Sequence, residues 1–115
     1  MNKLDLSYLN EISAGDISFV KEMLELFLNT TSIEVNEFDN HLVHGNFEAI
    51  GLLAHKMKAP IQMIGDSDLL EKIRSLEINC KNGTNLDIIP NLINEVKLAI
   101  NELSIDIKSN LETIN

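Results

Sequence analysis

The amino-acid sequence predicts an all-α protein, an antiparallel up-down-up-down four-helix bundle with a short N-terminal helix. Apolar residues recur at intervals of three and four over four long segments, which is the period of an amphipathic helix. Glycine beside a helix-capping residue marks the breaks, and the short connections make successive helices antiparallel. The 115 residues suffice for one core, so we expect a single domain over residues 1–115.

The first elements are a lead-in and a long helix. The lead-in, over about residues 5–12, is expected to lie as a short helix across one end of the bundle. The long helix should start at Asp16 and extend over roughly 27 residues. Thr30, Thr31 and Ser32 in its middle are weak helix formers, so a bend or break is plausible there. Its apolar stripe consists of Val20, Met23, Leu24, Phe27, Thr31, Val35, Phe38 and Leu42.

Three more helices follow, over about residues 46–64, 66–81 and 87–114. Pro90 falls in the first turn of the last one, where no intrahelical N–H is needed yet. Pro60 lies inside the second, and there it is expected to kink the helix or to leave a carbonyl without its donor.

Charge and composition exclude several classes of function. The net charge of −9 and a pI near 4.6 argue against nucleic-acid and anionic-membrane binding, which need a basic surface. Because the chain has no long apolar run and no signal-peptide pattern at its start, we expect a soluble, cytoplasmic protein. The single cysteine, Cys80, falls on an apolar stripe and is interpreted as a buried, inert thiol.

The most informative segment is residues 54–59, Ala-His-Lys-Met-Lys-Ala. At 100° per residue, His55 lies about 160° from the apolar stripe of its helix and should be exposed. Lys58 follows one turn later, where side chains meet. Taken alone, an exposed histidine is most simply a solvated polar residue. Four of the nine basic residues fall between positions 56 and 74, which predicts a local positive spot at His55; they are Lys56, Lys58, Lys72 and Arg74.

Several positions together resemble the histidine-containing phosphotransfer (HPt) domain family, over about residues 9–103. The matching positions around the histidine are Ala54, His55, Met57, Lys58, Ile64 and Gly65, and those elsewhere are Gly15-Asp16, Phe19, Leu24, Phe27, Gly45-Asn46 and Leu76-Glu77. Two departures matter. Ala59 stands where the family usually has glycine, and Pro60 follows it.

The resemblance implies a phosphorelay of two-component signal transduction. His55 would accept a phosphoryl group from a receiver-domain aspartate and pass it to another receiver domain, and Lys58 would stabilise the charge on the transferring phosphoryl oxygens. The partners would be response-regulator receiver domains, a hybrid sensor histidine kinase, or both. The sequence has no nucleotide-binding motif. We therefore expect a phosphoryl carrier and not an enzyme, with no cofactor of its own and with Mg²⁺ on the partner receiver domain.

The expected partner surface surrounds the histidine. Its members are Gly51, Leu52, Lys56, Ala59, Gln62 and Met63. Gly51, Ala59 and Gln62 share the exposed sector of the helix, whereas Leu52 and Met63 could equally be core. We expect a transient interface and a monomeric protein.

Alternatives stay open. The same bundle could be a non-phosphorylated helical adaptor that binds receiver domains, or a purely structural bundle. His41 and His44, with Glu37 one turn earlier, could form a metal site, but the helix dipole alone favours imidazoles near a helix C-terminus. The direction of phosphate flow, and whether the chain is free-standing or part of a hybrid kinase, are not readable from the sequence.

Overall fold

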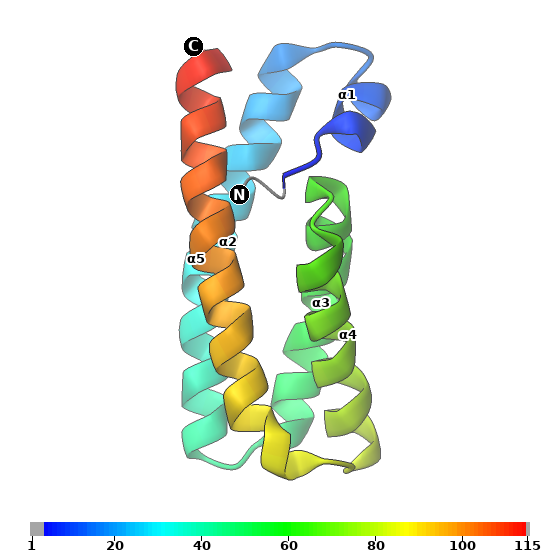
Figure 1. Cartoon of the computed structure of the whole chain (residues 1–115), viewed down its shortest axis with the longest axis vertical. Helices are drawn as coiled ribbons and strands as arrows, with labels where there is room; N and C mark the ends of the chain where they lie inside the picture. The colour runs from blue at the N-terminus through cyan, green and yellow to red at the C-terminus, as the bar shows by residue number, and fades with distance from the viewer. Residues whose placement is uncertain (1–3, 115) are drawn as a thin grey trace.

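The computed structural model describes residues 4–114, and within that range it contains helices and no strand, as predicted. The helices are α1 (Ser7–Ser13), α2 (Ile17–Val43), α3 (Phe47–Ile64), α4 (Ser67–Asn82) and α5 (Ile89–Ile114), with a 3₁₀ turn η1 (Leu86–Ile88) before α5. The molecule is elongated, with extents of 43 × 22 × 21 Å, and its long axis follows the four long helices (Figure 1). In the described part of the chain, no helix is both long and apolar enough to span a bilayer.

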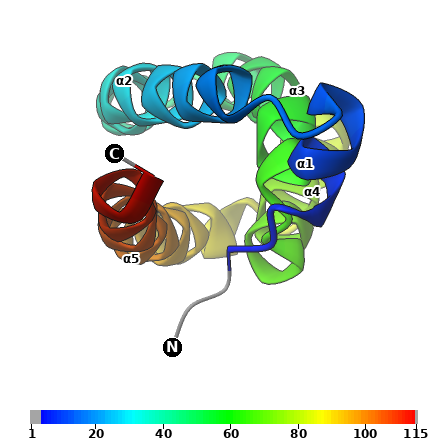
Figure 2. The same cartoon turned by 90° about the horizontal axis from the view of Figure 1, so that it is seen from above.

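The four long helices form the predicted antiparallel bundle. Each packs against its neighbour in the chain, and α5 returns to α2, which closes the ring (Figure 2). The short helix α1 lies across one end and contacts α2 and α3, as the lead-in was expected to do. Its Leu9 is fully buried, so α1 covers the end of the core.

Side-chain caps begin three of the long helices where the sequence predicts. Asp16, Asn46 and Asp66 are the N-cap residues of α2, α3 and α4. Their side-chain oxygens accept hydrogen bonds from the backbone N–H groups of Phe19, Ala49 and Leu69, at 3.2, 3.1 and 3.1 Å. Each cap contributes about 1 kcal/mol to helix stability.

Residues 30–32 do not break the helix, because α2 is continuous from Ile17 to Val43. The Thr31 hydroxyl donates a 2.7 Å hydrogen bond to the Phe27 carbonyl one turn back, so this buried polar group is satisfied within the helix. Helix α3 likewise continues through Pro60 to Ile64, and Pro60 itself is exposed. Because proline has no N–H, the carbonyl of Lys56 lacks its usual donor there.

Helices α3 and α4 approach each other closely at Gly51. A Cβ atom on Gly51 would lie 3.1 Å from the Cβ of Cys80, tighter than ordinary side-chain contact. Glycine therefore permits this spacing, which brings the middle of α4 against the helix that carries His55. Cys80 is buried there, as expected, and burial raises the pKa of its thiol.

Candidate functional site

The imidazole of His55 lies on the surface of α3, as the helical periodicity predicts. Its side chain is 67% exposed. Leu52, Lys56, Ala59 and Gln62 surround it and are also exposed. The ring is therefore open to a second macromolecule.

A carboxylate on α4 joins the two predicted functional side chains. The Nδ1 of His55 is hydrogen-bonded to Oε2 of Glu77, and the Nζ of Lys58 donates to Oε1 of the same carboxylate at 2.7 Å. The hydrogen bond from Lys58, with a smaller contribution from His55, lowers the pKa of the Glu77 carboxyl. Glu77 is therefore ionised at neutral pH. Its carboxylate binds the Lys58 ammonium and the His55 imidazole at the same time.

The contact to Glu77 selects one nitrogen of the imidazole. When Nδ1 of a neutral ring donates its hydrogen to a carboxylate, the lone pair resides on Nε2. The arrangement thus presents Nε2 of His55 as the nucleophilic atom, on a side chain that is mostly exposed.

No role was predicted for Glu77, which appears among the family-matching positions only as part of the Leu76-Glu77 pair. The two partners of the hydrogen bond are 22 positions apart and on different helices. The available signal was that Leu76 is a core position of α4, which places the next residue at the edge of the helix interface. Which residue of α3 it would face depends on the register of the two helices.

Three members of the expected partner surface differ in their exposure. Gly51 was expected to be exposed, and that expectation is wrong, because it is buried against α4 beside Cys80. Leu52, for which the sequence left two readings, is 66% exposed. Met63 is partly buried and packs against the core.

The expected positive spot forms only in part. Lys56 and Lys58 lie near His55 on α3. Lys72 and Arg74 instead line a groove between α4 and α5, which also contains Glu71 and other acidic residues. The structure therefore does not gather all four basic side chains around the histidine.

The other two histidines lie at the far end of α2. His44 is the C-cap residue, and its Nδ1 contacts the Asn40 carbonyl oxygen at 2.8 Å. Among residues 4–114, no three or more His, Cys, Asp or Glu side chains cluster closely enough to hold a metal ion. A metal site at His41 and His44 therefore receives no support from the described geometry.

Comparison with solved structures gives a close structural match. The crystal structure of histidine-containing phosphotransfer protein B (HptB) from Pseudomonas aeruginosa PAO1 superposes with a TM-score of 0.88 over 96% of both chains, at 20% sequence identity. The chain has the fold of a histidine-containing phosphotransfer protein. The resemblance drawn from the residues is thus confirmed at the level of the fold. No protein-family model matches the sequence, and a search of curated proteins finds no match.

On an HPt fold, the site consists of one exposed histidine, a lysine one turn later and a carboxylate from the adjacent helix. The superposition covers 96% of both chains, so the two proteins share the whole bundle that positions these side chains and not only a local helix pair. The fold does not specify a reaction, which depends on the side chains themselves.

Proposed function

We propose that this protein is a histidine phosphotransfer intermediate of a multistep phosphorelay. In this proposal His55 accepts a phosphoryl group from the aspartyl phosphate of one receiver domain and passes it to an aspartate of another. The observation that carries the proposal is the exposed imidazole, held at Nδ1 by Glu77, on an HPt fold. Such a ring can approach a phosphorylated carboxylate on the surface of a partner.

The chemistry needs no further reactant. The lone pair of Nε2 attacks phosphorus, so an N–P bond forms while the P–O bond to the aspartate breaks, and the aspartate leaves as a carboxylate. Nδ1 keeps its proton, and the ring becomes positively charged. Glu77, hydrogen-bonded at Nδ1, stabilises that charge. Attack by the aspartate of a second receiver reverses the step and restores neutral His55.

Lys58 stabilises the phosphoryl group during its transfer. An ammonium has three N–H donors, and the bond to Glu77 occupies one of them. The others can donate to phosphoryl oxygens, on which negative charge is spread during transfer. The ion pair with Glu77 orients Lys58 toward the side of α3 that carries His55.

The partners in this proposal are response-regulator receiver domains, with or without a hybrid sensor histidine kinase, in the cytoplasm. The chain acts as a carrier without a kinase module. We assign the Mg²⁺ needed for transfer to the receiver domain, as the family resemblance implies. A transient complex with a monomer of this protein fits the need for release after each transfer.

The partner surface in this proposal comprises Leu52, Lys56, Ala59 and Gln62, with Met63 at its margin. Exposed Leu52 supplies an apolar contact next to the histidine. Ala59 carries one methyl group more than the glycine that is usual at this position of the family. It therefore leaves less space for the backbone of a partner to approach the helix. These residues surround the imidazole without covering it.

Phosphate transfer from a phosphorylated receiver domain tests the proposal. The native protein, a His55→Gln variant and a His44→Gln control are compared, the control removing another exposed histidine outside the site. We expect an acid-labile, base-stable adduct on the native protein and the control only, and its return to a second receiver. Absence of label on the native protein, with receiver binding intact, would reject the relay and favour the non-phosphorylated adaptor.

A further inference from the structure

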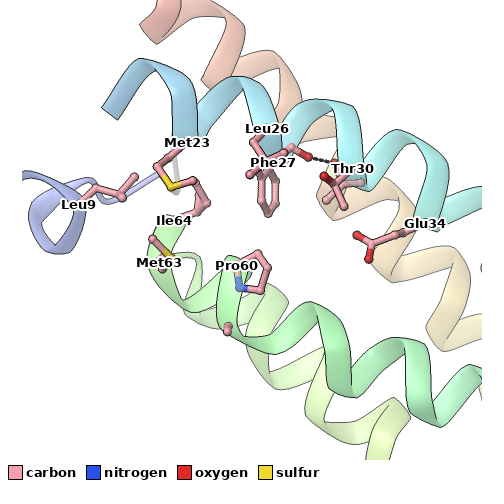
Figure 3. A pocket seen from close by; sticks show the side chains of 11 residues that line it. Leu9, Met23, Leu26, Phe27, Thr30, Glu34, Pro60, Met63 and Ile64 are labelled. Carbon is pink, nitrogen blue, oxygen red and sulfur yellow. Dashed lines mark hydrogen bonds between the residues drawn. The ribbon is translucent and has the colours of Figure 1, made fainter. Parts of the chain in front are cut away.

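A cavity of about 340 Å³ lies between α2 and α3, under the end that α1 covers (Figure 3). Its size is within the range of small-molecule sites, and its lining is almost entirely apolar. It lies outside the cluster formed by His55, Lys58 and Glu77. The lining residues are Leu9, Met23, Leu26, Phe27, Thr30, Thr31, Glu34, Ala59, Pro60, Met63 and Ile64.

The walls of the cavity are adaptable. Figure 3 shows Met23 and Phe27 of α2 facing Pro60 and Met63 of α3 across the opening. Methionine side chains are flexible and polarisable, and they adjust to irregular apolar ligands. Ala59 leaves space at the mouth, because its side chain is a single methyl group.

One acidic side chain enters this apolar cavity. Glu34 is only 5% exposed, although carboxylates are rarely buried without a partner. Within the described chain, no hydrogen bond or ion pair engages its carboxylate, and no fully enclosed polar side-chain atom lacks a partner. The Glu34 oxygens must therefore reach accessible space, and Figure 3 shows the carboxylate directed toward the cavity.

The charges near Glu34 do not compensate for the burial of its carboxylate. Burial raises the pKa of the carboxyl, as does the nearby Glu37, whereas Lys56 acts in the opposite direction. A buried carboxylate is stabilised most by a cationic hydrogen-bond donor placed beside it. The cavity offers room for such a group together with an apolar body.

We propose that this cavity binds a small apolar amine, with its ammonium group on Glu34 and its hydrocarbon part between Met23, Phe27 and Met63. Thr30 adds a second polar side chain to the cavity lining. An anionic ligand is excluded by the carboxylate, and a neutral hydrocarbon leaves it unpaired. This site shares Ala59 and Met63 with the proposed partner surface, but amine binding requires no phosphotransfer at His55 and stands whether or not that function holds.

The test uses hexylamine as the probe and hexan-1-ol as its neutral analogue, on the whole chain of 115 residues. Methionine methyl groups labelled with ¹³C report binding directly by NMR. We expect hexylamine to shift Met23 and Met63, while Met57, buried in the core away from the cavity, stays unchanged. Hexylamine should bind about tenfold more tightly than hexan-1-ol, since a charge-assisted hydrogen bond is gained.

Two variants locate the preference. Glu34→Gln keeps the shape of the side chain and should lower hexylamine affinity about tenfold, while hexan-1-ol binding is unchanged. The matched control Glu37→Gln, three residues later on the same helix and outside the cavity lining, should retain the preference. Equal affinity of the two probes for the native protein, an unchanged preference in Glu34→Gln, equal shifts at Met57, or no binding of hexylamine would each overturn the proposal.

Discussion

The contact between Glu77 and His55 gives a quantitative expectation for phosphotransfer. In a Glu77→Gln variant the side chain keeps its shape and an acceptor oxygen, but it loses its charge. A hydrogen bond to a charged group contributes about 1.5–3 kcal/mol and a neutral one about 1 kcal/mol. The difference is about 0.5–2 kcal/mol. Because His55 is 67% exposed, solvent screening keeps it in the lower half of that range, about 1 kcal/mol. We therefore expect transfer to His55 to slow about fivefold.

The assay is the initial rate of phosphate transfer from a phosphorylated receiver domain, combined with ¹⁵N NMR of the imidazole. The native ring should carry its hydrogen on Nδ1, and Glu77→Gln should shift the population toward hydrogen on Nε2. Glu71→Gln is the matched control, because it makes the same chemical change at an exposed position of α4. Unchanged tautomer populations and an unchanged rate in Glu77→Gln would refute the idea that Glu77 orients the nucleophile.

Three further substitutions test the packing. Gly51→Leu should separate α3 from α4 and lower the urea midpoint by several tenths of a molar or more, since even a Cβ would lie 3.1 Å from Cys80; a native midpoint would contradict this contact. Gly65→Ala should lower the free energy of unfolding by at least about 1–2 kcal/mol, because its φ is 86° and a Cβ would also clash with the Asp5 carbonyl oxygen; a neutral effect in urea unfolding would argue against that backbone geometry. Glu34→Gln should stabilise the protein more at pH 7 than at pH 4, measured by unfolding at both pH values. The raised pKa of Glu34 means that native stability falls as pH rises above the unfolded value of 4.5, so a pH-independent gain would count against its burial.

Local signals predicted the helix starts and the exposed face of the histidine. Asp16 and Asn46 cap their helices through contacts within three residues, which a sequence displays directly. The exposure of His55 follows from the period of one helix. Neither feature depends on which other helix lies nearby.

The burial of Glu34 could also have been predicted from the sequence. Glu34 follows Phe27 by seven residues, so the two side chains lie within about 20° on α2, on its buried face. The predicted apolar stripe runs from Thr31 to Val35 and omits Glu34, a residue type that is usually exposed. Helix geometry outweighs the residue's preference here, and the cavity beside Pro60 supplies the accessible space that makes the position tolerable.

The close approach of α3 and α4 explains both the wrong prediction for Gly51 and the absence of a predicted role for Glu77. Gly51 lies about 120° from Met57 around α3, outside the apolar stripe, so a single-helix argument makes it exposed. Helix α3, however, packs against α4 as well as α2, and the close approach of α4 buries this additional sector. The same approach brings Glu77 to His55 and Lys58. Glycine at position 51 is thus part of what positions the site, because a larger side chain there would move the carboxylate away from the imidazole.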